Sequence, residues 1–177
     1  LRAELTPAGK GEERLRGSGL VLINPPWKLE TELGVLLPAL GVDVPPATSL
    51  RRDGELNISA VADLGGAVVA AVRAALAQPG SVGVIAAEAA VPGLQAALAA
   101  AEIETGSADE VEEEIRVTLL PSTVAKGLEY DHVIVVEPAE IVAAEPRGLH
   151  RLFVVLTRAV SRLDVLHSGD LPAVLTG

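Results

Sequence analysis

The sequence predicts an α/β fold in which parallel strands alternate with crossover helices. Two observations support this prediction. From residue 61 onward, short runs rich in valine, isoleucine and leucine alternate with longer Ala-rich runs that have helical spacing. In addition, the runs at 115–120 and 132–137 are apolar enough to be covered on both faces, as parallel strands are. Because parallel neighbours need a crossover connection, this order predicts a layered sheet with helices on its faces.

Chain breakers and periodicity then define each element in order. Pro79-Gly80 ends the first helical run, and a connection with proline and glycine over 138–148 precedes the last two elements. The expected helices are 61–78, 94–101 and 149–163, of which the last is long and amphipathic. The expected strands are 81–86, 115–120, 132–137 and 164–167.

The beginning of the chain follows a different pattern. A polar, Gly-rich stretch leads into one short apolar strand and one helix, and Pro-bearing stretches follow. We therefore expect two parts: an N-terminal appendage or strap of mixed structure over 1–56, and the α/β domain over 57–177. The chain begins with leucine and not with methionine, which fits either a fragment of a longer protein or a trimmed chain.

Composition excludes several classes of protein. The absence of cysteine rules out disulfides and thiolate metal sites, and the three histidines lack metal-ligand spacing. No apolar run reaches the roughly 18 residues of a membrane span, so we expect a cytoplasmic protein without a membrane partner. After residue 56, seven basic residues face 16 acidic ones, a net charge of −9. This balance argues against a broad phosphate-binding face there.

Two short motifs carry most of the functional information. Residues 126–131 read Lys-Gly-Leu-Glu-Tyr-Asp and precede an expected strand, and residues 156–159 read Leu-Thr-Arg-Ala within the last expected helix. They resemble motifs V and VI of the second RecA-like motor domain, called 2A, of UvrD/Rep-type superfamily 1 helicases. The resemblance covers about residues 42–175 and is closer to UvrD-like and HelD-like helicase-type ATPases than to the superfamily at large.

This resemblance implies a RecA-like sheet and a specific set of nucleotide contacts. It implies that Lys126, Gly127, Glu129 and Thr157 contact ATP, with Gly127 and Glu129 at the carboxyl end of a strand. It also implies that Arg158 is an arginine finger, which stabilises the negative charge that phosphoryl transfer builds on the phosphate oxygens. For the two neighbouring arginines, Arg151 and Arg162, a solvated or salt-bridged role is expected instead.

Other helicase elements are missing from the sequence. There is no G-x-x-x-x-G-K-[ST] phosphate loop and no D-E-x-Q strand to hold magnesium. We therefore expect ATP with magnesium to be shared with an N-terminal RecA-like motor domain, and the isolated chain to be inactive. The resemblance implies single-stranded DNA or RNA polymerase as further partners. However, Pro121 and Thr123 replace the threonine and histidine with which classical helicases touch DNA.

Two other functions stay open. Residues 1–40 resemble the C-terminal region of RlmJ-type 23S rRNA adenine-N6 methyltransferases, and Asn24-Pro25-Pro26-Trp27 has the form of an adenine-methylating tetrapeptide that would use S-adenosylmethionine. That family's catalytic tetrapeptide lies upstream, so a strand end with a packed indole is the preferred interpretation. The second alternative is a non-catalytic interaction module whose acidic run, 109–114, binds a basic partner, although a solvated loop is the preferred interpretation of that run.

Overall fold

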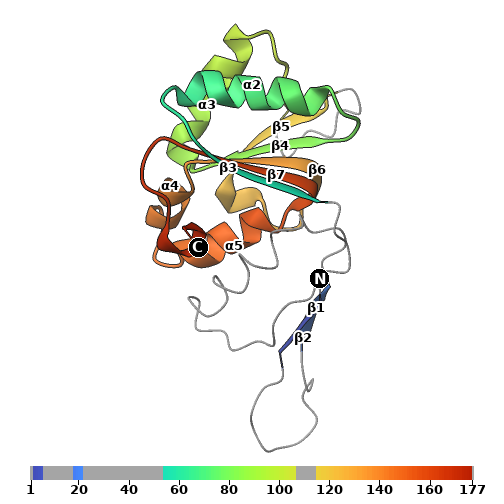
Figure 1. Cartoon of the computed structure of the whole chain (residues 1–177), viewed down its shortest axis with the longest axis vertical. Helices are drawn as coiled ribbons and strands as arrows, with labels where there is room; N and C mark the ends of the chain where they lie inside the picture. The colour runs from blue at the N-terminus through green and yellow to red at the C-terminus, as the bar shows by residue number, and fades with distance from the viewer. Residues whose placement is uncertain (1, 6–17, 22–53, 107–114, 177) are drawn as a thin grey trace, which may run out of the picture.

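The computed structural model describes residues 2–5, 18–21, 54–106 and 115–176 (Figure 1). Near the N-terminus, β1 (Arg2–Leu5) pairs antiparallel with β2 (Ser18–Val21). The strands of the main sheet are β3 (Glu55–Ala60), β4 (Val82–Ala86), β5 (Val117–Pro121), β6 (Tyr130–Val136) and β7 (Ala159–His167). The described helices are α2 (Leu64–Leu76), α3 (Val91–Ala100), α4 (Pro138–Ala143) and α5 (Gly148–Leu156).

Within the described residues the main sheet has five strands in the order β3-β7-β6-β4-β5, and all of its pairs are parallel. Helices α2 and α3 lie on one face, and α4 and α5 lie on the other (Figure 1). This arrangement confirms the predicted α/β fold, a parallel sheet with crossover helices of the RecA-like kind.

Each face of the sheet has its own apolar core, because successive side chains of a strand point to opposite faces. In β6, Val133 and Val135 pack toward α5, whereas Ile134 and Val136 pack toward α2. All four side chains are fully buried, which explains why this run reads as continuously apolar. Burial of each such side chain contributes about 1.5–3 kcal/mol.

The prediction of the last helix is wrong in its second half. Helix α5 ends at Leu156, and β7 begins at Ala159, where the periodicity predicts a helix up to residue 163. The segment 159–163 is a strand because Ala159, Arg162 and Leu163 pair with β6, and Arg162 and Leu163 also pair with β3 on the other side. Those two ladders override local helical spacing.

The first strand of the main sheet is missing from the predicted elements. The sequence pattern predicts an appendage or strap up to residue 56 and a helix from residue 61, yet β3 begins at Glu55 and pairs with β7 along its whole length. Residues 22–53 lie outside the described part, so the division of the chain after residue 56 stays a prediction. Strand β3 itself continues across that position. The tetrapeptide Asn24 to Trp27 and the acidic run 109–114 also lie outside the described residues.

Among the residues described, no helix has the length and apolarity that a bilayer crossing requires.

Candidate functional site

The loop that carries the first motif crosses from one end of the sheet to the other. It leaves the carboxyl end of β5 through a 3-10 turn, η2 (Ser122–Val124), and reaches the amino end of β6 at Tyr130. Because β4 lies between β5 and β6, the loop passes over β4. The fully buried Ala125 fixes this crossing on the α5 face of the sheet.

Lys126, Gly127 and Glu129 are exposed at the end of this loop. They directly precede β6, so they lie at the amino end of that strand. The expected position for Gly127 and Glu129, at the carboxyl end of a strand, is not the one observed. Gly127 has a positive φ of 87°, and nothing lies within 4 Å of the place where its Cβ would be. The backbone at this glycine is therefore open to solvent and free to approach a ligand closely.

Arg158 occupies the turn between α5 and β7. The expectation that it lies inside a helix is therefore wrong. Its half-buried guanidinium is held by three groups of the same chain. Nε donates to the carbonyl of Val154 at 2.9 Å, Nη1 donates to the carbonyl of Leu128 at 3.1 Å, and Nη2 donates to the hydroxyl of Thr157 at 3.1 Å. Three of the five N–H groups of a guanidinium are thus used, and the other two have no partner within the described residues.

The two motifs, which lie about 30 residues apart in the chain, meet at the amino edge of β6 and β7. Besides the bond from Arg158 to the Leu128 carbonyl, the backbone N–H of Tyr130 donates to the carbonyl of Arg158 at 3.0 Å. These two contacts place Arg158 beside the segment that carries Gly127 and Glu129. The predicted set is therefore one constellation on a single edge of the sheet.

Thr157 takes a different position from the other predicted residues. It is only 4% exposed, and its hydroxyl donates to the carbonyl of Val154 at 2.9 Å while it accepts from Arg158. In this structure Thr157 therefore orients the guanidinium. Its predicted contact with a nucleotide stays a prediction.

Among the described residues, Arg158 differs from the neighbouring arginines in its lack of an acidic partner. Arg151 pairs with Glu145 at 2.8 Å, and Arg162 lies 3.4 Å from both Glu55 and Asp164, as expected for salt-bridged residues. Within the described part of the chain, Arg158 has no carboxylate partner, and every acceptor that it meets is neutral. A preoriented guanidinium without a counterion is suited to bind an anion such as a phosphate.

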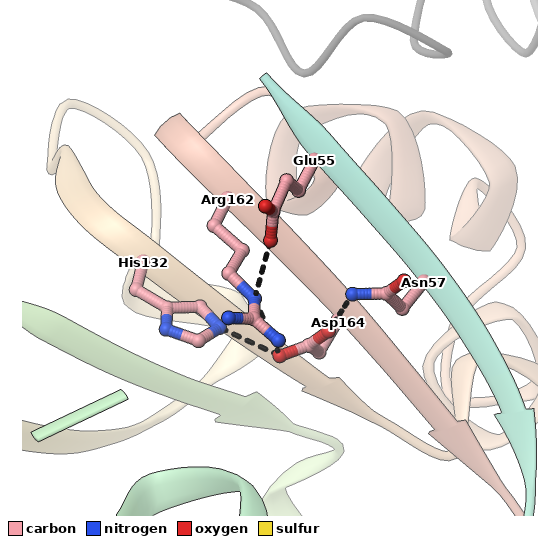
Figure 2. Close-up of polar contacts among 5 residues, drawn as sticks. All are labelled: Glu55, Asn57, His132, Arg162 and Asp164. Atoms are coloured by element: carbon pink, nitrogen blue, oxygen red, sulfur yellow. Dashed lines mark hydrogen bonds and ion pairs between the residues drawn. The ribbon is translucent and has the colours of Figure 1, made fainter. Parts of the chain in front are cut away.

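A second polar cluster is missing from the sequence prediction. It joins β3, β6 and β7 on the α2 side of the sheet and consists of Glu55, Asn57, His132, Arg162 and Asp164 (Figure 2). The signal that could have found it is a polar residue directly beside an apolar run in each of two strands: His132 before Val133 to Val136, and Asp164 between Leu163 and Val165.

Asp164 is the centre of this cluster. Its carboxylate accepts from the Asn57 amide at 2.8 Å and lies 2.7 Å from His132 Nε2. Burial acts to raise the pKa of Asp164, but the hydrogen bonds from His132 and Asn57 and the charge of Arg162 outweigh it, and the pKa is lowered. The ionised carboxylate therefore stabilises the fold by holding three strands together.

This lowered pKa predicts an acid dependence of stability. The contribution of Asp164 is fully present above its unfolded pKa, about 3.9, and is lost as the pH falls through the lower folded pKa. We expect Asp164→Asn to lower the free energy of unfolding at about pH 5, and the difference from the wild type to shrink toward about pH 3. Urea denaturation across this range measures both values. Asp170→Asn, at an exposed aspartate, is the control, and a difference that stays constant down to about pH 3 would contradict the prediction.

Comparison with solved structures supports the fold assignment. The C-terminal domain of a possible DNA helicase from Lactobacillus plantarum WCFS1 superposes with a TM-score of 0.63 at 19% identity, over 88% of this chain and 93% of that one. Two partial likenesses have lower TM-scores. The arterivirus nonstructural protein 10 helicase gives 0.45 at 19% identity, over 67% of this chain and 29% of that one. The Sulfolobus solfataricus SWI2/SNF2 ATPase core gives 0.46 at 13% identity, over 85% and 34%.

No family model matches the sequence, and no curated protein matches it. At 19% identity, the first likeness shows a shared fold, and function has to be argued from the site.

Proposed function

We propose that this chain is the C-terminal, 2A-type motor domain of a UvrD/HelD-like ATP-dependent helicase or translocase. In this proposal Arg158 is the arginine finger, and Lys126, Gly127 and Glu129 contact the nucleotide from the same edge. The observation that carries the proposal is the Arg158 guanidinium, which has no carboxylate partner among the described residues and is held against the first motif by the Leu128 carbonyl. The shared fold with a helicase C-terminal domain agrees with it.

The proposed chemistry is electrostatic. ATP with magnesium, bound by an N-terminal RecA-like motor domain, would supply the phosphoryl group and its first charge neutralisation. The two unused N–H groups of Arg158 would then meet the phosphate oxygens from the opposite side. Thr157 acts as a positioning residue, because its hydroxyl accepts from Nη2 and thereby fixes the plane of the guanidinium.

The residues of the first motif have separate roles in this proposal. The open backbone at Gly127 permits close approach of the nucleotide, since no atom lies where a side chain would be. Lys126 and Glu129, both exposed beside it, would bind the phosphates and the sugar hydroxyls respectively. We also propose a cytoplasmic location, with single-stranded DNA or RNA polymerase as the partner on which the motor acts.

This half-site arrangement predicts that the isolated chain binds ATP weakly or not at all. The described constellation offers a guanidinium and an open turn, but the phosphate loop and the magnesium-binding strand are absent from the sequence. Isothermal titration calorimetry of the 177-residue chain with a nonhydrolysable ATP analogue and magnesium should give a dissociation constant no lower than about 1 mM, which is the range of a single unsupported charge contact.

Submicromolar binding would contradict the half-site proposal, because it would require a complete nucleotide site within this chain. Addition of the N-terminal motor domain should restore binding, and Arg147→Ala, at an exposed arginine at the other end of α5, should leave that restored binding unchanged.

A further inference from the structure

A tyrosine of the first motif spans three strands of the main sheet. Tyr130 is the first residue of β6, and it is only 8% exposed in the core on the α5 side. Its ring lies over Gly83 of β4, because a Cβ added to that glycine would lie 2.5, 2.7 and 2.8 Å from three ring carbons. Burial raises the pKa of the Tyr130 phenol, and the Thr118 side chain on β5 lies close enough to oppose that effect. The side chain therefore reaches from β6 across β4 to β5.

Gly83 provides the space that this ring occupies. It lies inside β4, where it pairs with Thr118 of β5 on one side and with Val133 of β6 on the other. A glycine inside a strand normally weakens the strand, because it has no side chain to pack and loses more conformational freedom on folding. Such a glycine often marks the close approach of another group, and here that group is the Tyr130 ring. A methyl group at residue 83 would have to displace the ring.

Tyr130 is also a direct backbone neighbour of Arg158. Its N–H donates to the Arg158 carbonyl at 3.0 Å, and it pairs with Ala159 at the start of β7. Two residues earlier in the chain, the Leu128 carbonyl accepts from Arg158 Nη1 at 3.1 Å. Within residues 126–130, Tyr130 alone is buried. Its ring therefore anchors the segment that holds Arg158.

The strand pairing beside Arg158 is irregular. Tyr130 pairs with Ala159, whereas His132 pairs with Arg162, so β7 has one residue more than β6 between these two pairs. An extra residue of this kind is a β-bulge, which interrupts the ladder locally and turns the strand. The regular ladder of β7 thus begins only after the bulge, and the contacts with Leu128 and Tyr130 hold Arg158 in front of it.

We propose that Tyr130 is a positioning residue for Arg158, and that its packing on Gly83 fixes the direction of the guanidinium. The ring fixes the backbone at Tyr130 and, through the short segment before it, the Leu128 carbonyl. These two groups then hold the backbone and the side chain of Arg158. The catalytic consequence rests on the arginine-finger function proposed above, but the position of the guanidinium can be measured without a nucleotide.

Gly83→Ala tests this proposal, because the added methyl group displaces the ring and leaves every hydrogen-bonding group around Arg158 in the sequence. NMR of the isotope-labelled 177-residue chain follows the Nε–H signal of Arg158, whose exchange with water is slowed by its bond to the Val154 carbonyl. We expect this exchange to become about tenfold faster, which is the effect of weakening one hydrogen bond. Tyr130→Leu, which removes the ring and adds nothing to β4, should have the same effect.

Two further variants separate positioning from stability. Tyr130→Phe keeps the ring and should leave the exchange of the Arg158 signal at its wild-type rate. Val84→Ala is the matched control, because Val84 is a fully buried neighbour of Gly83 whose side chain packs on the other face of the sheet. It should lower the free energy of unfolding, measured with urea, without changing this exchange.

The full-length protein gives the second measurement. There Gly83→Ala should lower the turnover number for ATP about tenfold and leave KM nearly unchanged, since a displaced arginine finger acts on the transition state. Wild-type exchange in both Gly83→Ala and Tyr130→Leu would overturn the proposal, and so would equal acceleration in Val84→Ala. If exchange accelerates as expected while turnover stays normal, Tyr130 still positions Arg158, and the arginine-finger function is the part that fails.

Discussion

Replacement of Arg158 by alanine in the full-length protein is expected to lower ATP turnover by about a thousandfold or more, as the loss of an arginine finger does. The physical reason is that the guanidinium acts on charge that exists only in the transition state, so turnover falls while nucleotide affinity changes little. Steady-state ATPase assays give the turnover number and KM separately. Arg158→Lys should fall nearly as far, because an ammonium cannot make the same three bonds and still present two N–H groups.

Stability needs its own control in this experiment. The sequence pattern places Arg158 within a helix, but its three intrachain hydrogen bonds predict a loss of about 1–3 kcal/mol in the free energy of unfolding when the side chain is truncated. Circular dichroism and urea denaturation should therefore accompany the kinetics. Arg147→Ala removes an exposed arginine from the other end of α5 and should preserve turnover. Normal turnover in a folded Arg158→Ala protein would remove the basis for a motor-domain assignment.

The second large effect is expected for Gly148→Ala. Gly148 is the first residue of α5, and a Cβ there would lie 1.8 Å from the backbone carbonyl oxygen of Val142 in α4. A backbone atom cannot rotate away as a side chain can, so the two helices would have to separate. We expect a loss of about 3 kcal/mol in the free energy of unfolding, at the upper end of typical overpacking costs.

Gly93→Ala is the matched control for this substitution. Gly93 also lies in a helix, α3, but no atom lies within 4 Å of the point where an alanine Cβ would be. There the alanine should stabilise the protein by about 0.5–1 kcal/mol, because it reduces the conformational entropy of the unfolded chain. Urea denaturation of both variants measures the difference. A loss at Gly93 as large as the loss at Gly148 would show that the α4–α5 contact does not control the effect.

The sequence alone determined the fold class and most of the central strands. The run from His132 to Val136 could be recognised because it is buried on both faces, and burial of this kind leaves a continuous apolar pattern in the sequence. The motif residues Gly127, Glu129 and Arg158 were also identified from local sequence, since short motifs keep their spacing whatever surrounds them.

The tertiary structure decided the features that depend on neighbours distant in the chain. Residues 159–163 have helical spacing but form a strand, because β6 pairs with this segment on one side and β3 pairs with its last two residues on the other. Arg158 therefore lies in a turn at the amino edge, where it meets the Leu128 carbonyl. The His132–Asp164 pair likewise arises only from the parallel register of β6 and β7. Pairing partners and register are set by long-range contacts, which no local pattern in the sequence records.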